Sequence, residues 1–128
     1  MEKYKWENRI LIVKTKEEQS DIYQKQIAVF SSAAALLKDR KLVLYQIVGS
    51  NYQLTDYKKG GKEESGEVSA QVAEELLNEQ HSFEVILIGL DGGVKLRKTD
   101  LLTKEELCNK IDSMPMRQAE LKSRNRKK

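Results

Sequence analysis

The chain has 128 residues, of which 39% are hydrophobic and 34% charged, a length that suits one compact domain and is too short for two. Its net charge is +3, and its single cysteine (Cys108) and single histidine (His81) exclude an intramolecular disulfide, a CxxC motif, a cysteine zinc cluster and most histidine metal sites. No stretch approaches the ~20 apolar residues of a transmembrane helix, and the first residues form no apolar signal core, so an exported form of this chain would be the mature one.

The first predicted elements are a strand and a long helix. The run Arg9-Ile-Leu-Ile-Val-Lys14 is apolar and rich in β-branched residues, which is typical of a strand buried on both faces of a parallel sheet. Thr15 and Glu18 have the spacing of a capping box, with Thr15 as the N-cap, and predict a helix that ends near Lys38. The apolar side chains at positions 23, 27, 30, 34 and 37 fall on one face of that helix.

A second strand, a long loop and a second helix are predicted next. Residues 41–48 are mostly apolar and are followed by Gly49, as expected of a strand that ends there. Residues 49–66 contain Gly60-Gly61 and pairs of like charges without a hydrophobic period, so we expect an exposed, mobile loop there. Residues 68–80 have the apolar spacing of a helix.

A hairpin follows in the last part of the chain. Residues 83–89 read as a buried strand, and Asp91-Gly92 is a strong hairpin signal because both central positions of a type I′ turn need a positive φ. Residues 94–97 alternate apolar and basic side chains, which indicates an edge strand whose charges discourage edge-to-edge pairing.

The last predicted helix begins at a second capping box, formed by Thr103 and Glu106. It ends near Ser113, because the residue ahead of Pro115 avoids the helical region. We therefore expect a domain over residues 1–117 and a basic, flexible tail over residues 118–128.

The predicted order β-α-β-α-β-β-α indicates an α/β fold. Its βαβ start requires a right-handed parallel crossover, and its later hairpin adds two antiparallel strands. We expect a thioredoxin-like core, in which helices flank a four-stranded mixed sheet.

Several segments resemble a bacterial and animal family catalogued as a domain of unknown function, which is thioredoxin-like and nearest to the peroxiredoxins. The most specific stretches are Asp91-Gly-Gly-Val-Lys-Leu-Arg97 and Ile111-Asp-Ser-Met-Pro-Met-Arg117. Related domains occur in sushi-repeat-containing proteins and in a coiled-coil-domain-containing protein of the animal extracellular matrix. The resemblance implies a thioredoxin-like fold and a periplasmic or secreted location, and it supplies no established reaction.

No catalytic residue, metal ligand or cofactor can be assigned. Thioredoxin-like enzymes carry their thiol where the first strand meets the first helix, and residues 15–21 contain no sulfur. The candidate binding residues are Thr15 and Glu18 at this junction, and Arg97 and Arg117 in the two specific stretches. Helix capping and ion pairs are the simpler roles for them.

One arginine carries a structural prediction of its own. Pro115 prevents the preceding helix from continuing, so we expect the chain to turn back with Met114 or Met116 packed on the domain. We expect Arg117 to be partly buried there and paired with Asp91 or Asp112.

These observations favour a non-catalytic binding or interaction module, whose partner is an unidentified protein or small molecule. Its candidate surface is the loop over residues 49–66 beside the junction at residues 15–21. Two alternatives stay open. One is a thiol-dependent antioxidant enzyme that uses Cys108, although a free cysteine on an inner helix face is usually a core residue. The other is weak binding of nucleic acid or an anionic membrane by the basic tail.

Overall fold

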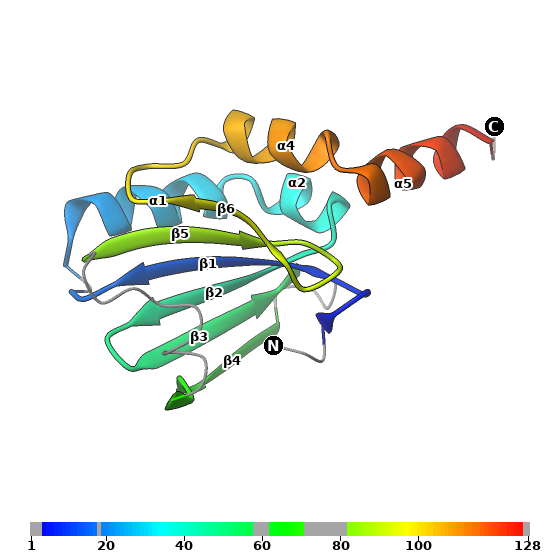
Figure 1. Cartoon of the computed structure of the whole chain (residues 1–128). Coiled ribbons are helices and arrows are strands. Elements are labelled where there is room, and N and C mark those ends of the chain that lie inside the picture. Colours follow the sequence, from blue (N-terminus) through cyan, green and yellow to red (C-terminus); the bar gives the residue numbers. More distant parts are fainter. Residues whose placement is uncertain (1–3, 18, 58–61, 71–81, 127–128) are drawn as a thin grey trace.

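The computed structural model describes residues 4–17, 19–57, 62–70 and 82–126 (Figure 1). In this part of the chain the strands form a six-stranded sheet in the order β4-β3-β2-β1-β5-β6. The central pair, β1 and β2, is parallel, and every other neighbouring pair is antiparallel. The strands are β1 (Arg9–Thr15), β2 (Leu42–Val48), β3 (Asn51–Asp56), β4 (Lys62–Glu67), β5 (Phe83–Ile88) and β6 (Val94–Lys98).

The core lies on both faces of this sheet, and β1 contributes to both. All seven residues of β1 are buried, as the sequence predicts. Leu11 and Val13 belong to one apolar cluster, and Ile10 and Ile12 belong to a second cluster. Because successive side chains of a strand point to opposite faces, the two clusters lie on opposite sides of the sheet.

Helices cover the face that contains the first cluster (Figure 1). α1 (Asp21–Ser31) and α2 (Ala34–Asp39) contribute Tyr23, Phe30 and Leu37, and α4 (Lys104–Asp112) contributes Leu107 and Ile111. α5 (Pro115–Arg126) follows α4 and extends away from the sheet (Figure 1). None of the described helices is long and apolar enough to cross a membrane.

The prediction of one helix capped by Thr15 is wrong. Thr15 is the last residue of β1, where it pairs in register with Val48, so the parallel ladder holds it in extended structure. The helix begins only at Asp21, and it is interrupted at Ser32-Ala33 before α2. The Ser32 hydroxyl donates to the Val29 carbonyl at 2.8 Å, a local bond of the kind that competes with helical continuation.

The prediction of a mobile loop over residues 49–66 is also wrong, because most of this segment forms β3 and β4. Gly49 has a φ of 60° and begins a two-residue turn, after which Asn51 pairs with Val48. Glycine at the first central position suits a type II′ hairpin turn. The described strands therefore number six instead of the four predicted.

The predicted hairpin between β5 and β6 is confirmed, although its turn is not type I′. Only Gly92 has a positive φ, of 82°, whereas a type I′ turn would also need one at Asp91. The Gly89 N–H donates to the Gly93 carbonyl at 2.9 Å, which closes a loop longer than two residues. β6 lies at the edge of the sheet, as predicted.

The start and the end of α4 also agree with the prediction. Thr103 is the N-cap and its hydroxyl oxygen accepts the Glu106 N–H at 3.1 Å. The helix ends at Asp112, and Pro115 opens α5 at a position where a missing N–H costs no hydrogen bond.

Two further predictions remain open. The helix predicted over residues 68–80 lies almost wholly outside the described residues. α5 runs across the predicted boundary at residue 117, and a separate flexible tail stays a prediction. What the structure establishes is a mixed α/β fold with a six-stranded mixed sheet flanked by helices.

Candidate functional site

The structure describes one of the two candidate binding residues at the junction between β1 and α1, namely Thr15. The Gly49 N–H donates to the Thr15 carbonyl at 3.0 Å, so the junction lies beside the turn from β2 to β3. Thr15 is buried, and its hydroxyl donates to the Glu17 carbonyl at 2.9 Å. This hydroxyl is therefore engaged within its own turn. Glu18 lies outside the described residues.

Arg97, the candidate on β6, forms an ion pair across the hairpin. Its Nη1 lies 3.2 Å from Oε1 of Glu84, a buried residue of β5. Arg97 therefore forms an ion pair within its own hairpin, with neither Asp91 nor Asp112, and its use as a binding residue stays a prediction. It shares no acidic partner with Arg117, so the structure does not unite the two candidate arginines in one site.

Arg117 is buried and paired, as predicted. Only 2% of its side chain is exposed. Its Nε donates to Asp112 at 3.1 Å, its Nη2 to Asp39 at 2.8 Å and its Nη1 to Glu120 at 3.2 Å. The predicted Asp112 pair is confirmed, whereas Asp91 pairs with Lys95 instead.

Arg117 belongs to a larger arginine cluster that ties α5 to β1, α2 and α4. Arg9, at the start of β1, contacts Glu120 with both terminal nitrogens, at 3.4 and 3.2 Å. Arg40 donates to both carboxylate oxygens of Asp112, at 3.2 and 2.9 Å. Such charge-assisted, two-pronged bonds fix orientation as well as position. The cluster comprises Arg9, Arg40, Arg117, Asp39, Asp112 and Glu120.

Interactions within the arginine cluster shift the pKa values of Asp112 and Arg117. Burial alone would raise the pKa of Asp112, but hydrogen bonds and charges from Arg40 and Arg117 outweigh it and hold that pKa below its usual range. Burial alone would lower the pKa of Arg117, and its hydrogen-bonded acids raise it instead. Asp112 and Arg117 are therefore both ionised near neutral pH.

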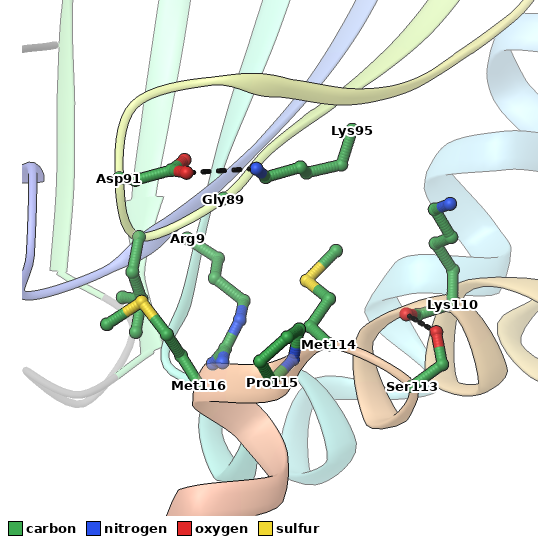
Figure 2. Close-up of a pocket in the computed structure, with 10 residues that line it drawn as sticks. Arg9, Gly89, Asp91, Lys95, Lys110, Ser113, Met114, Pro115 and Met116 are labelled. Carbon is green, nitrogen blue, oxygen red and sulfur yellow. Dashed lines mark hydrogen bonds and ion pairs between the residues drawn. The ribbon is translucent and has the colours of Figure 1, made fainter.

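A pocket of about 360 Å³ opens beside the arginine cluster, between the β5–β6 hairpin and the junction of α4 and α5 (Figure 2). Arg9 belongs to both the cluster and the pocket wall. In the view of Figure 2 its side chain runs between Met116 and Met114. The hairpin contributes Leu90, Asp91 and Lys95, and Lys110 stands on the α4 side.

The hairpin wall of this pocket is braced by an ion pair. The Nζ of Lys95 lies 3.0 Å from a carboxylate oxygen of Asp91 (Figure 2). The lysine stem crosses Gly89 so closely that a Cβ there would lie 2.6 Å from Lys95 Cε. A hydrogen bond from the Gly93 N–H, and then Lys95, hold the pKa of Asp91 below its usual range.

The comparisons with known proteins bear on this architecture. A family model described as "Domain of unknown function (DUF4174)" matches residues 1–120. The chain belongs to the DUF4174 family. Comparison with curated proteins and with solved structures gave no match. The matched residues of this DUF4174 domain include all six members of the arginine cluster.

The thiol of the DUF4174 domain lies outside the pocket lining. Cys108 is half-buried in α4 between the core residues Leu107 and Ile111. Burial raises its pKa, so the thiol stays protonated near neutral pH. The described residues also contain no group of histidine, cysteine and acidic side chains that could hold a metal ion.

Sequence reasoning missed Arg9 and Arg40 as site residues in the DUF4174 domain. The sequence places Arg9 in a buried strand, where a long cationic side chain needs a partner. The need for a partner could therefore be inferred from the sequence. The identity of the partner could not, because Glu120 lies 111 positions further along the chain.

Proposed function

We propose that this DUF4174 domain is a non-catalytic binding module built on a thioredoxin-like core. Support for the core comes from β2, β1, β5 and β6, which combine a parallel central pair with an antiparallel hairpin. In this proposal β3 and β4 are an addition at the β2 edge. The expected extracellular or periplasmic setting remains part of the proposal, as implied by the resemblance.

The observation that supports a non-catalytic role is the position of the only thiol. A thioredoxin-like enzyme needs a thiolate at the end of the first strand, where the helix N-terminus lowers its pKa. Residues 15–21 have no cysteine, and Cys108 sits in α4 with a raised pKa. The alternative of an antioxidant enzyme would require the opposite shift at Cys108.

The pocket beside the arginine cluster is the binding surface that we propose. It replaces the segment over residues 49–66, most of which is engaged in β3 and β4. The pocket volume of about 360 Å³ falls within the range typical of small-molecule sites. Its wall combines apolar side chains with a few charged ones, as such sites usually do.

The test compares the domain with Cys108→Ser in assays of peroxide consumption and insulin reduction. We expect neither protein to exceed the rate of the buffer with reductant alone. Thiol-dependent turnover that disappears in Cys108→Ser would refute the proposal and favour the antioxidant enzyme.

A further inference from the structure

One buried donor in the pocket wall has no partner. The Nη atoms of Arg9 donate to the Arg40 carbonyl and to Glu120, but its Nε has no hydrogen-bond partner within the described residues. Only 1% of the Arg9 side chain is exposed. A buried N–H of this kind is normally met by protein, ordered water or a bound ligand, because its desolvation is otherwise uncompensated.

A second cation on the pocket wall is also uncompensated. Lys110 is exposed, and its ammonium group has no carboxylate partner in the described part of the chain. The other charges of the wall are matched, since Lys95 pairs with Asp91 and Arg9 with Glu120. The wall therefore has one net positive charge to offer to a ligand.

The rest of the pocket wall is apolar or offers few hydrogen-bond donors. Leu90, Met114 and Met116 line it, and methionine side chains adapt readily to different ligand shapes. α5 begins at this wall, but Pro115 removes one of the backbone N–H groups that a helix N-terminus would give to a phosphate. The single unmatched cation of the wall also disfavours a doubly charged ligand.

We propose that this pocket binds a small monocarboxylate that carries an apolar tail. The carboxylate interacts with Lys110, and the tail packs on Leu90, Met114 and Met116. The free N–H of Arg9, which lies between the two methionines, takes one carboxylate oxygen when these adaptable side chains move apart. This inference rests on the binding function proposed above and gives it a ligand class.

The experiment is an NMR titration of the labelled domain with sodium hexanoate at constant ionic strength. We expect saturable shifts confined to the amides of residues 89–95 and 113–117. Hexan-1-ol, which has the same tail without the charge, should bind more weakly, and hexyl phosphate should not bind more tightly than hexanoate.

Two lysines of α4 provide matched variants. Lys110→Ala should weaken hexanoate binding about five- to tenfold, because it removes a charge-assisted hydrogen bond. Lys104→Ala, which removes an exposed lysine of α4 that does not line the pocket, should leave the affinity within about twofold of the parent.

Three results would overturn the inference: no saturable shift at the pocket, equal binding of hexanol and hexanoate, or tighter binding of hexyl phosphate. Equal weakening by both lysine variants would reduce the effect to general surface charge and would overturn it as well. Each of these results leaves the non-catalytic role intact, because only thiol-dependent turnover refutes that role.

Discussion

At the scale of single residues, the arginine cluster joins parts of the chain that are far apart in sequence. Each of its arginines is at least nine-tenths buried, while its carboxylates range from 15% to 40% exposed. Removing an arginine therefore leaves its acidic partners without a cation, although these carboxylates keep some access to water. The loss of folding stability should lie below that caused by breaking a fully buried ion pair, which is roughly 3–5 kcal/mol.

Arg117→Ala should lower the free energy of unfolding by about 2–3 kcal/mol, because three acids lose their shared cation. Urea denaturation followed by circular dichroism measures the change. Lys122→Ala, at an exposed position of the same helix, should change the free energy by less than about 0.5 kcal/mol. An unchanged urea midpoint for Arg117→Ala would contradict the role of the cluster in stability.

The lowered pKa of Asp112 makes part of the stability depend on pH. Because Arg40 and Arg117 favour its ionised form in the folded state, Asp112 contributes stability above its unfolded pKa of about 3.9. That contribution is lost as the pH falls through the lower, folded pKa. The stability difference between the parent and Asp112→Asn should be constant near neutral pH and shrink below about pH 4.

Urea midpoints of both proteins across the acid range measure this dependence. Glu105→Gln, which removes an exposed carboxylate of the same helix, is the control. A difference between the parent and Asp112→Asn that stays constant down to pH 3 would contradict the assignment.

Residue-level prediction from the sequence succeeded where the constraint was local. Pro115 fixes where α4 must stop, and this restricts Arg117 to a position near Asp112, five residues earlier. Arg40 and Asp112 meet over a separation of 72 residues. Their pairing depends on how α2 and α4 pack, which no local pattern encodes.

At the scale of secondary structure, the same Thr-x-x-Glu spacing occurs twice, but only one of the two threonines caps a helix. Thr103 and Glu106 form the predicted cap, whereas Thr15 stays in β1. Thr103 follows residues without strand pairing, so its backbone is free to begin a helix. Thr15 continues a ladder with Val48, and tertiary pairing overrides its local preference.

Thr103→Ala should destabilise the domain by about 1 kcal/mol, because the Glu106 N–H loses the hydroxyl that it donates to. Thermal unfolding monitored by circular dichroism gives the comparison. Thr99→Ala, at an exposed position of the loop before α4, is the matched control. Equal effects of the two substitutions would argue against a capping role for Thr103.

The missed strands β3 and β4 show where pattern reading fails. Tyr52 and Leu54 do alternate with polar residues, and Leu54 is almost fully buried. β4, by contrast, has the sequence KEESGE, without a single large apolar side chain. Its pairing with β3 is expressed in backbone hydrogen bonds, which side-chain periodicity does not report.

At the scale of the whole molecule, the sequence correctly indicated an α/β fold and the central parallel pair. Local patterns predicted β1, β2, β5 and β6 within a residue or two, because these strands are strongly apolar or follow clear turns. The pocket was not predictable. Its walls come from β1, the β5–β6 hairpin and the helix junction, and only their packing brings these segments together.

The alkylation rate of Cys108 should report on unfolding of the domain. Its half-buried position and raised pKa predict slow alkylation by iodoacetamide in the native state and fast alkylation in urea. Mass spectrometry at timed intervals measures both rates. Native labelling as fast as that of the unfolded chain would show an accessible thiolate, which would also revive the antioxidant alternative.

The ion pairs that the structure describes for α5 lie in the first half of this helix. The ion pairs that the structure describes between α5 and other elements come from Arg117 and Glu120, which lie one turn apart. α5 has 12 residues, and so a length of about 18 Å. These ion pairs therefore set the direction of a helix whose far end points away from the sheet (Figure 1). Because the pocket wall includes the first residues of α5, a ligand that moves this wall should also tilt the helix.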